Sequence, residues 1–312
     1  MTTLPWPAVA ILLGTPLGAA GLAALITPAA ALPALFGALA GVAGSVLAPA
    51  KRSLAPMLAG LITLGLLLLH PSQPVLWVMA LCLCALAGWE TVRTGGRAMV
   101  LVIYACIGLH LVPAMPPVSI AAPVAAAALL AGWAIAQMTG LAGKAAPAPA
   151  SPLHGVMLAS YLAIGLALSL LVMQVMQSPF AHWVAMIFTM RALAPMDMTT
   201  TSTLHFGLGA TLGCLAAMAV IALGLPEPLL MALSLPAVIA AFRLVPHPRP
   251  YTPALVSAAV LFLAAPDLND ALVRLEVTLV VVFLSLSLST GLALLLHTGP
   301  ARLLARRSDL PG

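Results

Sequence analysis

The sequence predicts an all-α polytopic membrane protein of about twelve transmembrane helices, arranged as two parallel six-helix repeats. Composition, the spacing of apolar segments and the placement of basic residues predict it. Hydrophobic residues make up 63% of the 312 residues and charged residues only 6%, whereas a soluble domain carries about 25% charged residues. Because so few polar side chains cannot cover a water-facing surface, we expect the chain to lie in a lipid bilayer.

Apolar segments recur along the whole chain, and a segment of about 20 mostly apolar residues is long enough to cross a membrane. Breaks at Pro, Gly, His and charged residues divide the sequence into such segments. The predicted spans are residues 5–26, 30–49, 54–70, 74–90, 98–114, 118–140, 154–176, 180–195, 203–224, 228–245, 252–266 and 272–296.

Basic residues test this division, because cytoplasmic loops collect Lys and Arg. With the N-terminus inside, eleven of the twelve Lys and Arg residues fall on one side, and Arg274 is the exception. The opposite side receives Glu227, Asp267, Asp270 and Glu276. We therefore expect both termini to be cytoplasmic, and the net charge of +5 to reflect this bias rather than binding to nucleic acid. The richness in Ala, Gly and Pro favours a bacterial inner membrane.

An Ala/Pro-rich segment, residues 142–153, is predicted to be a cytoplasmic linker between a first repeat, residues 1–141, and a second repeat with a short basic tail, residues 154–312. "APAKRSLAPMLAGLITLG" (48–65) and "APMDMTTTSTLHFGLGATLG" (194–213) both place Ala-Pro before a polar step and a small-residue helix containing Thr-Leu-Gly. Six spans per half is an even number, so the repeats are predicted to be parallel, as in many transporters.

The stretch "HWVAMIFTMRALAPMDMTTTSTLHFGLGATLG" (182–213) resembles the fusaric acid resistance (FUSC-type) family of integral membrane transporters, in which a Trp-led span precedes a Pro-Asp turn, Thr-rich residues and a glycine-spaced helix. "RLEVTLVV" (274–281) is similar to the opening of that family's last span. The family's motif arginine is here His205 or Phe206, and its Gly-Thr is Gly209-Ala210. The resemblance implies efflux of aromatic or other organic acids.

Candidate substrate-binding residues gather around the polar turn after the eighth span. They are Trp183, Arg191, Asp197, Thr199, Thr200, Thr201, Thr203 and His205. An ionisable group at membrane depth is a functional candidate, and Arg191 offers a cation to a carboxylate. Alternatively, Arg191 extends to the cytoplasmic headgroups, and Asp197 or a hydroxyl caps the next helix.

Three glycines of the ninth span, Gly207, Gly209 and Gly213, are predicted to allow close helix packing, since small residues four apart let two helices approach in lipid. His110 is a candidate proton relay, because histidine titrates near physiological pH; the alternative is a hydrogen-bonded interface histidine.

Acidic residues are missing from the middle of every predicted span, which favours an anionic substrate over a cation. The sequence contains no known hydrolase motif, so we expect no enzymatic activity, and we expect neither a metal nor a cofactor. We expect a homo-oligomer or a periplasmic adaptor as possible protein partners. Two alternatives stay open: a non-transporting membrane assembly or stability protein with a decayed transporter motif, and a drug exporter of the major facilitator type.

Overall fold

The structure, a computed structural model, describes residues 4–176, 178, 180–193, 200–244, 250–264 and 267–298. Within these ranges the chain forms α-helices joined by short turns, with no strand. The helices are α1 (Trp6–Ile26), α2 (Ala31–Leu47), α3 (Leu54–Leu67), α4 (Gln73–Thr94), α5 (Ala98–Leu111), α6 (Val118–Met138), α7 (Pro152–Met176), α8 (Trp183–Leu193), α9 (Thr200–Ile221), α10 (Glu227–Arg243), α11 (Tyr251–Ala264) and α12 (Leu268–Thr298). Each predicted span therefore overlaps one of these helices.

Eight helical segments in the described part of the chain are long and apolar enough to cross a membrane. The helices α5, α8 and α11 are apolar but shorter. Large apolar side chains such as Leu25, Phe283 and Leu295 are exposed, as is favourable only where lipid surrounds the helices. The chain is thus an all-α, multi-pass membrane protein.

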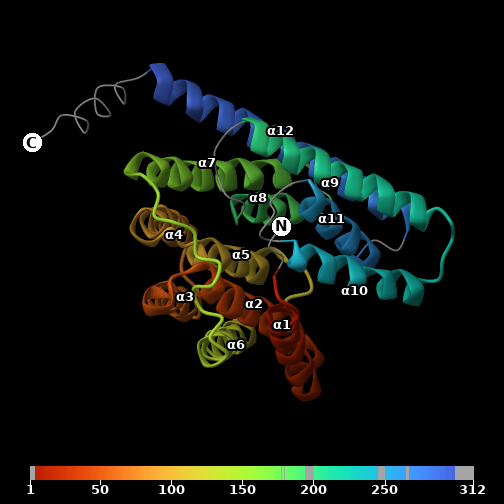
Figure 1. Cartoon of the computed structure of the whole chain (residues 1–312), viewed down its shortest axis with the longest axis horizontal. Coiled ribbons are helices and arrows are strands. Elements are labelled where there is room, and N and C mark those ends of the chain that lie inside the picture. Colours follow the sequence, from red (N-terminus) through yellow and green to blue (C-terminus); the bar gives the residue numbers. More distant parts are fainter. Residues whose placement is uncertain are drawn as a thin grey trace, which may run out of the picture.

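The two halves of the chain lie on opposite sides of the molecule (Figure 1). Helices α1–α6 occupy one side and α7–α12 the other, and α5 contacts α8 in the middle. Two further pairs join the halves: α4 packs against α7, and α1 packs against α10. The linker lies along the first half, where the amide of Ala150 donates to the carbonyl of Thr91.

Small residues bring α2 and α6 into close contact in the first half. Gly37 and Gly41 of α2 lie directly against the backbone of Ala125 and Leu129, where any side chain on either glycine would clash. Close packing of this kind holds helices together in lipid, where there is no hydrophobic drive between them.

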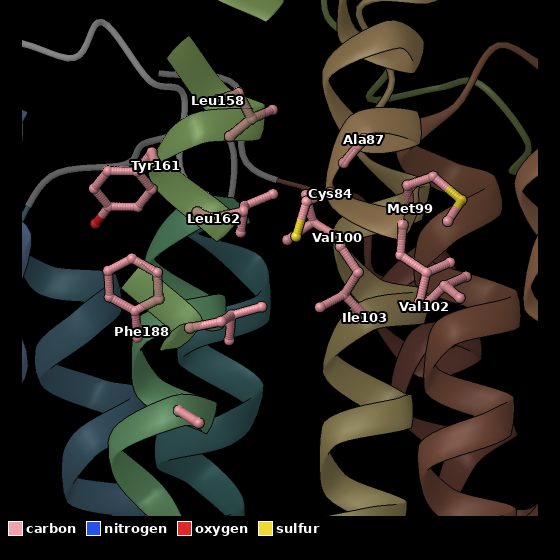
Figure 2. Close-up of a cluster of buried hydrophobic side chains, with 14 of the residues drawn as sticks. Cys84, Ala87, Met99, Val100, Val102, Ile103, Leu158, Tyr161, Leu162 and Phe188 are labelled. Atoms are coloured by element: carbon pink, nitrogen blue, oxygen red, sulfur yellow. The ribbon is translucent and has the colours of Figure 1, made fainter. Parts of the chain in front are cut away.

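The largest apolar cluster lies where the halves meet, between α4, α5, α7 and α8 (Figure 2). Leu158 and Leu162 of α7 extend toward Cys84 and Ala87 of α4, whereas the Tyr161 ring lies on the other side of α7. Packing against the first half, through this cluster and α5, therefore holds α8, the helix that carries Arg191, in position.

Candidate functional site

Helix α8 is the centre of the candidate site, and it is unusually short. Its eleven residues rise about 16 Å, roughly half the thickness of a hydrocarbon core. It packs against α5, α7 and α12, so both of its ends lie among other helices.

Arg191, near the C-terminal end of α8, is 1% exposed. One guanidinium nitrogen, Nη2, donates a hydrogen bond to Thr203 Oγ1 of α9 at 3.0 Å. The guanidinium carbon also lies 5.6 Å from the centre of the Phe206 ring. Arg191 is thus held inside the helix bundle instead of extending into the headgroups.

The hydroxyl of Thr203 continues the polar contact into α12, because it lies 3.4 Å from the hydroxyl of Ser289. Thr203 and Ser289 are both buried. Arg191, Thr203 and Ser289 therefore connect α8, α9 and α12 through one chain of polar atoms.

One side of α12 is polar and buried over much of its length. We call it the buried polar face of α12: Arg274, Thr278, Ser285 and Ser289. Its members are spaced by four, seven and four residues, which keeps them on one side of a helix. From Arg274 to Ser289 the face extends over about 22 Å, with the apolar Val281 between its two pairs.

Tyr161 of α7 adds a further hydroxyl beside this face. Its ring stacks on Phe188 of α8 with the ring centres 4.7 Å apart, and Gly165 leaves the space that the Phe188 ring occupies. The Tyr161 hydroxyl neighbours Ser285 and points away from α4 and α5 (Figure 2). Neither hydroxyl forms a well-directed hydrogen bond within the described residues, and the same is true of the buried Ser169 hydroxyl of α7.

At the opposite end of α8, Arg274 lies over the ring of Trp183, with its guanidinium carbon 3.8 Å from the ring centre. Trp183 is eight residues before Arg191, or about 12 Å along the helix. The two arginines thus lie toward opposite ends of α8, and the buried polar face of α12 extends between them.

A buried turn of the first half fixes the C-terminal end of α8. Arg97 Nη1 donates to the carbonyl of Ala192 at 3.1 Å. Glu90, 4% exposed, accepts from the amides of Ala98 at 3.1 Å and Met99 at 2.8 Å. Because the amides at the start of a helix have no partner within it, the Glu90 carboxylate caps α5 and shapes the turn that presents Arg97.

The structure brings only part of the predicted site together. Arg191 and Thr203 are in contact, whereas Thr201 and His205 are exposed on α9. The Trp183 ring lies under the guanidinium of Arg274 instead. Asp197 and Thr199 lie outside the described residues, as does the side chain of Thr200.

The remaining candidates lie away from these arginines. His110 is exposed in the last turn of α5. Gly209 lies against the backbone of Pro250, just before α11, Gly213 lies against the backbone of Ala254 in α11, and Gly207 lies against Val282 of α12.

Sequence reasoning missed the contribution of α12 and of Tyr161. The signal was present in "SLSLST", where Ser285 and Ser289 are four residues apart and continue the side that begins with Arg274 and Thr278. Among the described residues, no group of His, Cys, Asp or Glu could hold a metal ion. Comparison of the chain with family models, with curated proteins and with solved structures finds no match.

Proposed function

We propose that this chain is a transporter of small organic anions, similar to the FUSC family, and that the buried polar face of α12 lines its substrate path. The observation that carries the proposal is a row of buried hydroxyls on α12 between two buried arginines, Arg191 of α8 and Arg274 of α12. A charged side chain at the centre of a membrane helix costs about 2.5–3.5 kcal/mol on insertion scales. A buried charge that costs this much is expected to have a function.

The hydroxyls support a path rather than a purely structural network. A buried polar group without a hydrogen bond costs about 1–3 kcal/mol, and most buried polar groups in proteins have a partner. The Ser169 hydroxyl has no hydrogen-bond partner within the described part of the chain, and the neighbouring hydroxyls of Tyr161 and Ser285 form no well-directed bond there. A passing substrate with acceptor oxygens would complete the hydrogen bonding of these groups.

The sign of the charges supports an anion. Of the acidic residues in the described ranges, Glu227, Asp267 and Asp270 lie near the starts of α10 and α12, Glu90 caps α5, and Glu276, inside α12, is exposed away from the buried polar face. A guanidinium binds carboxylates through directed hydrogen bonds, and the aromatic rings of Phe188, Phe206 and Trp183 suit an aromatic acid.

Pairings of helices support the two-repeat arrangement that belongs to this proposal. The hydroxyl of Ser53, just before α3, accepts hydrogen bonds from Trp133 and Gln137 of α6. Thr203 and Ser289 link α9 with α12 in the corresponding way. Exchanging the two halves, α1–α6 for α7–α12, likewise turns the contact of α4 with α7 into the contact of α10 with α1. We accordingly place twelve helices in a bacterial inner membrane, with both termini cytoplasmic and transport directed outward.

The test is uptake of radiolabelled benzoate and p-hydroxybenzoate into proteoliposomes preloaded with the same unlabelled acid. We expect exchange by the wild type and a loss of at least about tenfold in Arg191→Gln, since a hydrogen-bonded charge pair contributes about 1.5–3 kcal/mol. A rhodamine dye serves as the cationic substrate.

Serines of α12 provide the matched control. Ser285 and Ser289 are buried whereas Ser287, between them, is exposed. We expect Ser289→Ala to slow exchange and Ser287→Ala to leave it unchanged. Equal rates in these two variants would exclude α12 from the path. Exchange of the dye alone would indicate a drug exporter, and no exchange of any compound by folded protein would favour the non-transporting alternative.

A further inference from the structure

The surroundings of Arg274 differ from those of Arg191. Arg274 is 8% exposed, and it lies in the second turn of α12. Its Nε and Nη1 atoms are fully buried and have no hydrogen-bond partner among the described residues. A guanidinium is charged at every physiological pH, so these N–H groups form a buried donor set without an acceptor.

Groups facing Arg274 come from three other helices, and none of them is a carboxylate. Trp183 of α8 lies under the guanidinium, and the titratable groups of Tyr104 in α5 and Cys214 in α9 interact with it electrostatically. Asp270 and Glu276, on the same helix, form no salt bridge with Arg274 in the described structure, and Glu276 is exposed.

The start of α8 adds a second positive contribution at the same place. Trp183 is the first residue of α8, and a helix N-terminus carries about half a positive charge. Unlike Arg191, which lies near the negative C-terminal end of α8, Arg274 is held where the helix dipole opposes a cation. An anion between the helix start and the guanidinium would satisfy both.

We infer that Arg274 and Trp183 form a second binding site, for the carboxylate of a small aromatic acid, at the opposite end of α8 from Arg191. The unpartnered N–H groups of Arg274 donate to the carboxylate. Tyr104 and Trp183, both partly exposed, provide aromatic surface for the ring of the acid, and Phe36 lies 5.6 Å from Tyr104. The inference rests on the proposed function for the class of ligand and for the path, and it adds a second position along α12 where the substrate binds.

Trp183 itself reports on this site, because an anion drawn to the stacked guanidinium changes the surroundings of the indole. The experiment uses full-length protein in which Trp6, Trp77, Trp89 and Trp133 are replaced by Phe, so that Trp183 is the remaining tryptophan. Benzoate is added and the emission of Trp183 is recorded. We expect a saturable change, with the affinity reduced at least about tenfold in Arg274→Gln.

Arg243 gives the matched control, since its guanidinium also lies over an aromatic ring, that of Trp6 at 4.1 Å, and the Phe replacement keeps an aromatic ring there. Arg243→Gln should leave the titration unchanged. Arg274→Lys, which keeps the charge and a similar volume, provides a second variant if the glutamine variant does not fold, and we expect intermediate affinity. Unsaturable emission in the parent protein, or equal affinity in folded Arg274 and Arg243 variants, would overturn the proposal.

Two further measurements separate this site from the proposed function. Chloride and phosphate are titrated alone, and saturation by either with the affinity of benzoate would overturn the assignment to organic acids. Arg191→Gln is titrated as well: saturable benzoate binding in a variant that no longer exchanges benzoate would support the second site independently. If wild-type protein exchanges no acid but Trp183 still saturates, transport fails while the site stands.

Discussion

Replacing Glu90 tests how strongly the turn that joins the halves depends on one buried carboxylate. Glu90→Ala removes the acceptor of the Ala98 and Met99 amides. A hydrogen bond to a charged group contributes about 1.5–3 kcal/mol in soluble proteins, so two bonds give about 3–6 kcal/mol. Side-chain hydrogen bonds in membranes contribute less, because the unfolded chain also finds partners there; we therefore expect a loss of about 2–4 kcal/mol in the free energy of unfolding. Glu90→Gln retains one acceptor oxygen and should lose about half as much.

Unfolding in mixed micelles, titrated with SDS and followed by tryptophan fluorescence, measures this loss. Glu227→Ala is the control: Glu227 also lies at a helix start, in α10, but it is exposed, so only a helix-dipole contribution of about 0.3–1 kcal/mol is at stake. Equal destabilisation by the two alanine variants would refute the reasoning that burial and capping make Glu90 structural.

Two glycine substitutions test the close contacts in the second half. Gly213→Leu should destabilise the protein by at least about 2 kcal/mol, because Gly213 lies against the backbone of Ala254 and overpacking costs about 1–3 kcal/mol or more. Gly65→Leu, at the corresponding Thr-Leu-Gly of the first half, has open space around it and should unfold at nearly the wild-type SDS concentration; a shift as large as that of Gly213→Leu would contradict this. Gly165→Val should displace the Phe188 ring from Tyr161 and reduce benzoate exchange, whereas wild-type exchange would show that the stacked pair does not border the path.

Helix positions could be predicted from the sequence because apolar runs and their breaks are local features. Errors arose where a charge was assumed to end a helix. The fourth span was predicted to end at residue 90, but α4 continues to Thr94, because the buried Glu90 carboxylate finds partners in the next helix. The twelfth was predicted to begin at 272, but α12 begins at Leu268, where Asp267 accepts from the amide of Asp270 at 2.9 Å and caps the helix.

The candidate site could be predicted only in part, because it depends on pairings between distant segments. Arg191 and Thr203 are close in the sequence, and a search for polar residues near one turn finds both. Ser289 is 86 residues beyond Thr203, and only the packing of α9 against α12 makes them neighbours. Tyr161 resembles an interface tyrosine in the sequence; its stacking on Phe188 places it inside the bundle.

Arg274 shows why an exception to a compositional rule is informative. The bias toward cytoplasmic Lys and Arg concerns residues that can remain in headgroups, and Arg274 is the one basic residue that the predicted topology places on the other side. Arg274 is not exposed. Its guanidinium is buried over Trp183, and it lies beside the start of α8, where the helix dipole is also positive. Burial and the nearby helix start are each unfavourable to a cation, so we expect a bound anion to stabilise the arrangement. An arginine exposed to the headgroups would carry no such implication, which is why the buried Arg274 gives a sharp test of anion transport.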